Sequence, residues 1–193
     1  IEVSPGKEVS TLLDEMLLTG FQGRRLAEAV DVWSRMLRRR NMVIWMGLAG
    51  AMVPAGMRRI ISYFIERRMV DVIVSTGANL YHDVVEALGG RHYLGSPVVD
   101  DLKLHKHRID RMYDVFADEK RFYKVDNWID MELGGSLKDD YPYSSREVMQ
   151  ELGRILSSRR RGDKSSIVVS AYRHGVPVFC PSLADSSLGF SIM

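Results

Sequence analysis

The chain has little cysteine. Its single thiol, Cys180, excludes an intramolecular disulfide framework and fits a reducing compartment, so we expect a cytoplasmic protein. The thiol lies in the apolar stretch VPVFCP, which predicts an inert buried side chain rather than a nucleophile. No apolar run approaches the ~20 residues that span a bilayer, and we therefore expect no membrane partner.

An excess of charge of either sign is also lacking. The 27 basic and 25 acidic residues nearly cancel, so the overall field gives no strong reason to expect a nucleic-acid partner. A basic triplet at residues 38–40 falls at the end of a predicted helix, where cations complement the helix dipole. We interpret this triplet as a helix end rather than a nucleic-acid patch.

Common catalytic and metal motifs are absent as well. No set of histidines, cysteines or carboxylates has the spacing of metal ligands, which predicts a protein without a metal. The nucleophile elbow G-x-S-x-G and the dinucleotide fingerprint G-x-G-x-x-G do not occur. His82 and Asp83 are adjacent on a predicted helix, so their side chains point in different directions and are not expected to act as a dyad.

The sequence does contain two successive strand–turn–helix units. Residues 42–58 and residues 70–83 (VDVIVSTGANLYHD) each combine an apolar run, a turn of small residues and the start of a helix. Two such units build a nucleotide-sized crevice at the carboxyl ends of parallel strands, with right-handed crossovers between the strands. We therefore interpret the chain as containing a cofactor-binding domain.

Apolar periodicity and helix-end signals predict the remaining elements. The expected helices cover residues 8–18, 24–40, 56–69 (opened by Pro54), 79–88 (closed by Gly89 and Gly90), 120–133 and 144–156, and the expected strands cover residues 43–45, 70–74 and 176–180. The rest of the segment 93–140 is mixed and charged, and residues 159–166 form a polar, basic loop.

Two of these segments carry specific local signals. Ser144 and Glu147 form the S-x-x-E pattern of a capping box at the start of a helix. Residues 166–174 are ambiguous, because their β-branched side chains favour a strand whereas the ending Arg173-His174-Gly175 favours a helix with a glycine stop. We predict a helix there.

These elements predict an α/β fold with an open, mostly parallel, Rossmann-like sheet flanked by helices. We expect a helical N-terminal segment over residues 1–41 and a partial NAD-binding domain over residues 42–193. The chain stops just after the loop that follows the third strand, so the fold is expected to be incomplete at its C-terminal side.

The candidate cofactor site lies in the turns after the strands. Small residues there would let backbone N–H groups approach a pyrophosphate at helix N-termini; they are Gly47, Ala49, Gly50, Ala51, Gly56, Thr76, Gly77 and Ala78. Tight turns and close helix packing would explain the same glycines. Asp185 follows the third strand and is placed to accept hydrogen bonds from a ribose or an amide, or else to cap a helix.

Four segments of the chain resemble the deoxyhypusine synthase family. They are MVDVIVSTGANLYHD (69–83), KVDNWID (124–130), SSREVMQELGRIL (144–156) and GVPVFCPSLADSSLG (175–189). The last is the most specific, because it is similar to the family signature PVF-x-P-A-L-x-D-G-S-L-G. The resemblance extends over most of the chain.

The resemblance implies an NAD-dependent transferase, usually a homotetramer with active sites at a dimer interface. Such enzymes oxidise spermidine with NAD, pass its aminobutyl group to an enzyme lysine as an imine, and transfer it to one lysine of the hypusine-bearing translation factor precursor. Two alternatives stay open: an enzyme that acts on free polyamines, as in homospermidine formation, and a non-catalytic NAD-binding partner subunit.

The resemblance also implies roles for individual residues. The residues that match NAD-contacting positions of the family are Gly50, Ala51, Thr76, Gly77 and Asp185. His82 falls where the family commonly has an acidic group.

At the end of the signature, Phe190 replaces a carboxylate that grips a polyamine nitrogen. A phenylalanine can pack on a methylene chain or make a cation–π contact but supplies no countercharge. The family's catalytic lysine belongs to a glycine-rich motif well downstream of residues 181–189, and no lysine here has that context. The catalytic residue is therefore unknown, and we expect the chain alone to be inactive.

Overall fold

The structure is a computed structural model that describes residues 1–159, 163 and 165–192. It divides the chain into two compact units, residues 1–44 and residues 45–193. Half of the predicted polar loop over residues 159–166 falls outside the described residues, since positions 160–162 and 164 are not among them. In the described part of the chain, no helix is both long and apolar enough to cross a membrane.

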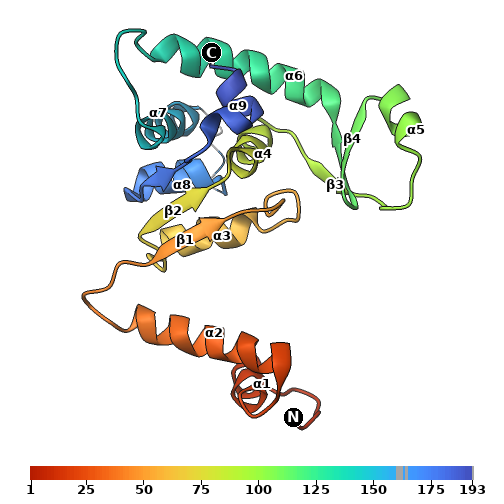
Figure 1. Ribbon diagram of the computed structural model, residues 1–193, viewed down its shortest axis with the longest axis vertical. Coiled ribbons are helices and arrows are strands. Elements are labelled where there is room, and N and C mark those ends of the chain that lie inside the picture. Colours follow the sequence, from red (N-terminus) through yellow and green to blue (C-terminus); the bar gives the residue numbers. More distant parts are fainter. Residues whose placement is uncertain (160–162, 164, 193) are drawn as a thin grey trace. The chain divides into compact units, whose positions relative to one another are not determined.

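The first unit is a pair of helices. α1 (Val9–Met16) and α2 (Phe21–Leu37) contact each other and are joined by a short turn (Figure 1). Both predicted helices are confirmed, although α2 begins three residues earlier than the apolar pattern indicates. Gly20, in extended conformation, is the residue before α2, and no side chain caps this helix among the described residues.

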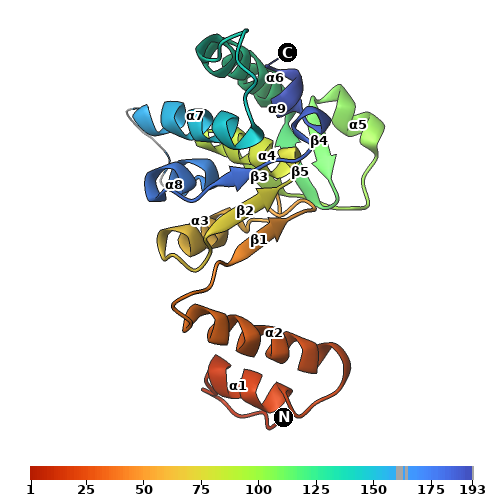
Figure 2. The same cartoon turned by 60° about the vertical axis from the view of Figure 1, so that its left-hand side comes forward.

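The second unit is built on a parallel three-stranded sheet, shown in Figure 2. Its order is β1 (Trp45–Leu48), β2 (Val72–Ser75) and β6 (Val178–Phe179). Gly47 pairs with Val74, and Ile73 pairs with Val178, so the three carboxyl ends meet at one edge of the sheet. The predicted open parallel sheet with flanking helices is confirmed.

Four helices pack around this sheet. They are α3 (Arg58–Glu66), α4 (Gly77–Ala87), α7 (Ser145–Ser158) and α8 (Ile167–His174). α8 contacts α3, α4 and α7, and each of these helices contributes buried side chains to the core. The core includes Ile65, Ile73, Leu80, Leu152 and Ile167. Cys180 is buried as expected, and burial raises the pKa of its thiol.

Local capping signals were accurate. Ser144 Oγ accepts from Glu147 N at 3.3 Å, while Glu147 Oε2 accepts from Ser144 N at 2.8 Å, which confirms the predicted capping box. The ambiguous segment is the helix α8, and it ends at Gly175 with a left-handed φ of 64°. Hydrogen bonds from Gly175 N and Val176 N close its last turn.

Two predictions around the first strand are wrong. Pro54 does not open a helix, because it lies in a turn closed by a bond from Met57 N to Met52 O at 3.0 Å. Gly56 adopts a φ of +86°, a left-handed value that is incompatible with a right-handed α-helix. The helix α3 therefore starts only at Arg58. The strand begins at Trp45, where the expected strand ends, since pairing with Val72 starts there.

A second, antiparallel sheet was missed. Its order is β3 (His92–Leu94), β5 (Val115–Asp118) and β4 (Ile109–Met112), with α5 (Asp101–Lys106) leading into β4. Strands of three or four partly exposed residues are too short to show a period in a charged segment. The predicted helix over residues 120–133 is confirmed as α6 (Glu119–Trp128) and a π-helical turn, Ile129–Leu133, and a 3-10 turn, Gly134–Ser136, follows it.

Candidate functional site

The ends of β1 and β2 are tied directly together. Thr76, which follows β2, donates its N–H to the carbonyl of Leu48 at the end of β1, at 3.1 Å. Gly50 lies two residues beyond Leu48 with a φ of +70°, and an added Cβ there would meet no atom within 4 Å. Gly50 and Ala51 therefore form an open turn beside Thr76, on the edge where the parallel strands end.

Asn79 connects the turn after β1 to the turn after β2. Its side chain is buried, its Oδ1 accepts from Val53 N at 3.2 Å, and its Nδ2 donates to Thr76 Oγ1 at 3.2 Å. Sequence reasoning missed this residue. The available signal was an amide in the first turn of a helix, where a short polar side chain usually bonds to nearby backbone.

The segment after β6 also borders the site, beside the turns that follow β1 and β2. This segment forms a 3-10 turn, Leu183–Asp185, and the short helix α9 (Ser187–Phe190), both of which contact α4. Ser186 is buried against Gly77, so closely that a Cβ at Gly77 would lie 2.1 Å from Ser186 Oγ. Close packing therefore explains Gly77, whereas Gly50 has open space.

Asp185 lies next to this contact and is exposed. Its carboxylate accepts a short hydrogen bond from Ser182 Oγ, and the N-cap of α9 is Ser186, so Asp185 does not cap that helix. The structure thus brings Thr76 and Gly77 against the segments that carry Gly50, Ala51 and Asp185. Asp185 is exposed at the surface beside this edge.

The N-terminus of α4 lies at this edge. Thr76 is its N-cap in extended conformation, and no described side chain caps the helix. The first-turn N–H groups of a helix carry partial positive charge and bind phosphates well. In the described part of the chain, no group of three or more potential metal ligands occurs.

Phe190 stands beside a polar hollow. It is 68% exposed, and the hollow is lined by Asp126, Asn127, Asp130, Ser187, Phe190 and Ser191. Asp126 Oδ1 accepts from Tyr81 OH at 2.6 Å and from Ser191 Oγ at 3.4 Å. Burial and the bond to Asp126 raise the pKa of Tyr81, so its hydroxyl remains a donor. Two carboxylates therefore border the aromatic ring.

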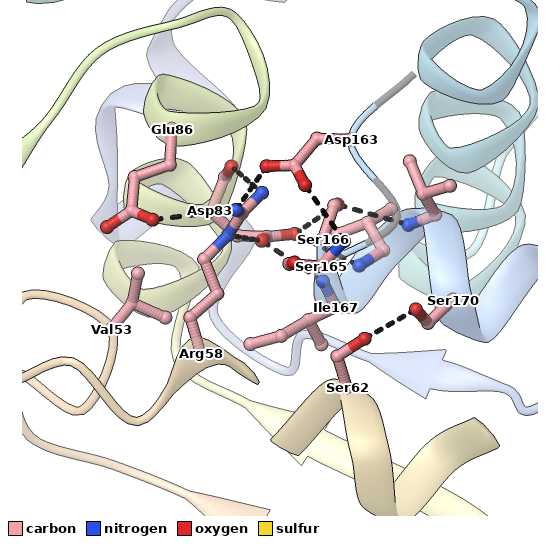
Figure 3. Close-up of polar contacts among 12 residues, drawn as sticks. Val53, Arg58, Ser62, Asp83, Glu86, Asp163, Ser165, Ser166, Ile167 and Ser170 are labelled. Atoms are coloured by element: carbon pink, nitrogen blue, oxygen red, sulfur yellow. Dashed lines mark hydrogen bonds and ion pairs between the residues drawn. The ribbon is translucent and has the colours of Figure 1, made fainter. Parts of the chain in front are cut away.

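A buried ionic cluster stabilises the helices behind the site (Figure 3). Asp83 on α4 is fully buried and accepts from Arg58 Nε at 2.5 Å and from Ser166 Oγ at 2.7 Å. It also accepts from the N–H groups of Ile167 and Val168, both at 3.0 Å, so Asp83 caps α8 from another helix. Arg58 pairs in addition with Asp163.

Electrostatics within this cluster favour the charged guanidinium. Burial lowers the pKa of Arg58, but the neighbouring Asp83 and Asp163 carboxylates outweigh burial and raise it. Asp83 points into this cluster, whereas His82 contacts the rings of His92 and Phe122. The two adjacent side chains do not contact the same partners, and the cluster is a structural one that joins α3, α4 and α8.

Comparison with known proteins gives a consistent family match. A sequence model described as deoxyhypusine synthase matches residues 11–193. The chain is 54% identical over 189 residues to "Probable deoxyhypusine synthase 2" of Methanosarcina mazei, covering 96% of this chain and 53% of that protein. It is 50% identical over 179 residues to the protein of the same name from Archaeoglobus fulgidus, covering 91% of this chain and 57% of that protein.

A solved structure supports the fold. The crystal structure of "a putative deoxyhypusine synthase from Entamoeba histolytica" superposes with a TM-score of 0.69 at 18% identity, over 97% of this chain and 63% of that one. At this identity the likeness concerns the fold alone. The chain spans about half the length of the curated relatives that it matches.

Proposed function

The chain belongs to the deoxyhypusine synthase family, and from this premise we propose that it forms part of a transferase that makes deoxyhypusine. The proposed reaction is NAD-dependent transfer of the aminobutyl group of spermidine to a lysine of the hypusine-bearing translation factor precursor. In this proposal residues 42–193 carry part of the NAD site and residues 1–41 form a separate helical segment. The complete enzyme is proposed to be a homo-oligomer.

The observation that carries this proposal is the shared edge of three strand ends. The uncapped N-terminus of α4, at Thr76 and Gly77, would hold the pyrophosphate through backbone N–H groups. Gly50 and Ala51 leave room for the dinucleotide beside Thr76, and Asp185 would accept hydrogen bonds from its hydroxyl or amide groups. When bound, NAD supplies the hydride acceptor.

Asp185→Asn tests the cofactor site. We expect NAD affinity of the full-length protein to fall about 10- to 100-fold, because a hydrogen bond to a charged group contributes about 1.5–3 kcal/mol. Calorimetric titration with NAD measures this affinity. Asp114→Asn, on the turn between β4 and β5, is the control and should bind like the unsubstituted protein. Equal affinity for both variants would remove Asp185 from the site.

The hollow beside Phe190 supports a polyamine substrate. Phe190 would pack on the methylene chain, while Asp126 and Asp130 would supply the countercharge that the aromatic ring lacks. Tyr81 fixes Asp126 by donating its hydroxyl to one of the carboxylate oxygens, Oδ1. Its other oxygen, Oδ2, is then the one oriented for an ammonium group.

Asp126→Asn tests the polyamine site. We expect KM for spermidine to rise about tenfold, which corresponds to ~1.4 kcal/mol, with NAD affinity unchanged. Initial rates at saturating NAD measure this effect. Asn127→Ala changes a neighbour in the same hollow that carries no charge, so it should alter KM less. If both variants change KM equally, charge at Asp126 is not what the substrate recognises.

The acceptor decides between this function and its closest alternative. The alternative is an enzyme that uses free polyamines, with putrescine as acceptor. Phe190 in place of a carboxylate is the feature that favours it. Incubation of the full-length protein with butyl-labelled spermidine, NAD and either the translation factor precursor or putrescine separates the two. Label on the precursor lysine supports deoxyhypusine synthesis. Label only on the small amine supports the alternative, and no transfer to either supports a non-catalytic NAD-binding subunit.

A further inference from the structure

One face of α4 carries three residues at one-turn intervals. Ala78, His82 and Glu86 are spaced four residues apart, so they lie on the same side of the helix. Ala78 is exposed in the first turn, at the edge where β2 ends, and His82 follows one turn later. The His82 ring contacts the rings of His92 and Phe122.

His82 ends a chain of polar contacts. Glu86 Oε1 lies 2.7 Å from His92 Nδ1, and His92 Nε2 lies 3.0 Å from His82 Nδ1. The second carboxylate oxygen of Glu86 lies 3.5 Å from Arg58 Nη1, which belongs to the buried ionic cluster. The position of the His82 ring is therefore set by contacts that lead back to α3.

When His92 is neutral, these contacts favour one tautomer of His82. A carboxylate only accepts, so His92 donates Nδ1–H to Glu86, and the Nε2 of a neutral His92 is then an acceptor. His82 must in turn donate from Nδ1, which leaves its own Nε2 with a lone pair. No described residue forms a hydrogen bond with His82 Nε2.

His82 is linked to the Phe190 hollow through Phe122. The ring of Phe122 on α6 packs against His82 at 5.7 Å and against Tyr81 at 5.8 Å between ring centroids. Asp126 follows Phe122 by one helical turn, about 6 Å along the same face of α6, and lines the hollow. His82 thus packs against α6 one helical turn away from Asp126.

We propose that His82 Nε2 accepts a hydrogen bond from a second nitrogen of the linear polyamine whose other ammonium group binds at Asp126. This inference rests on the proposed function. His92 and Glu86 are positioning residues that keep the lone pair of His82 directed at the substrate. The site would thereby bind two nitrogens of one polyamine. The Asp126 carboxylate would pair with the first, and the neutral His82 ring would accept a hydrogen bond from the second.

The electrostatics are consistent with a neutral acceptor. Burial lowers the pKa of His82 to about 4, and the nearby His92 lowers it as well, while Glu86 raises it. The ionisable groups around His82 are His92 from β3, Glu86 and Tyr81 from α4, and Arg58 behind Glu86. At neutral pH His82 is therefore uncharged and does not repel a cationic amine.

His82→Phe is the decisive variant, because it keeps a ring against Phe122 and removes the Nε2 acceptor, together with the Nδ1–H bond to His92. For the full-length protein with NAD, we expect KM for spermidine to rise at least tenfold and kcat to change much less. His82→Gln, which retains an acceptor oxygen, should recover part of this loss. His107→Phe, on an exposed residue at the end of α5, is the matched control.

Nitrogen NMR of labelled histidines gives a readout that does not depend on turnover. In the unsubstituted protein His82 should be protonated at Nδ1 only, its Nε2 resonance should shift on addition of spermidine, and Glu86→Gln should weaken the tautomer preference. An Nε2–H tautomer in the free protein would overturn the proposal.

Direct binding separates this inference from the proposed function. An active protein whose His82→Phe variant keeps the original KM would refute the role of His82 and leave the function standing. If the full-length protein makes no deoxyhypusine, calorimetric binding of spermidine decides. Weaker binding by His82→Phe then supports the acceptor role, and equal or undetectable binding by both proteins overturns it.

Discussion

Asp83→Asn is expected to lower the free energy of unfolding by about 3–5 kcal/mol, because removing one partner of a buried ion pair leaves the other charge uncompensated. Asp83 receives four donors, namely Arg58 Nε, Ser166 Oγ and two N–H groups of α8. An asparagine has one acceptor oxygen and would point its NH₂ group at donors. Urea denaturation followed by circular dichroism measures the loss.

Two further variants test whether the loss of stability in Asp83→Asn depends on the burial of the ion pair. Asp163→Asn removes a second partner of Arg58 at a side chain that is 30% exposed, so we expect a clearly smaller loss. Glu151→Gln removes a surface ion pair with Arg154 and should leave the midpoint nearly unchanged. If all three variants lose the same free energy of unfolding, the Asp83 cap has no special importance.

Gly77→Ala is expected to destabilise the protein by about 1–3 kcal/mol and to weaken NAD binding strongly. The added Cβ would lie 2.1 Å from Ser186 Oγ and 2.6 Å from Ser186 Cβ, so the segment carrying Asp185 must move. The backbone of Gly77 is helical, and alanine is otherwise the better residue in a helix. The loss therefore measures the contact with Ser186.

The double variant Gly77→Ala with Ser186→Gly provides the sharpest control. It removes both clashing atoms, and the next neighbour of the new Cβ is Cys180 Sγ at an ordinary 3.5 Å. We expect it to regain much of the lost stability and NAD affinity. Gly135→Ala, in the 3-10 turn after α6 where a Cβ meets nothing within 4 Å, should be almost neutral. A double variant no better than Gly77→Ala would contradict the steric explanation.

Local signals were enough to predict most helices of the fold. The capping box at Ser144 and the left-handed Gly175 each depend on a few neighbouring residues, so both were visible in the sequence. The prediction of a helix start at Pro54 was wrong because a proline suits a turn as well as a helix start. The left-handed φ of Gly56 keeps this segment in a turn. Short half-exposed strands, such as those of the β3–β5–β4 sheet, leave no comparable signal.

The candidate site was predictable at the level of its edge but not of its internal contacts. Parallel strand ends converge for topological reasons, so the turns at Gly50 and Thr76 could be placed together. The roles of Asn79, Ser186 and Asp83 depend on partners that are distant in sequence. Asn79 reaches Val53 across 26 positions, and Asp83 reaches Ser166 across 83.

The cap that Asp83 places on α8 has a consequence for folding. α8 leads directly into β6, yet its first N–H groups are satisfied by a carboxylate from a helix formed far earlier in the chain. Such a contact must close a loop of more than 80 residues before it stabilises anything, and contacts of this kind slow folding. We therefore expect the segment that carries Asp185 to reach its native position only after this long loop has closed.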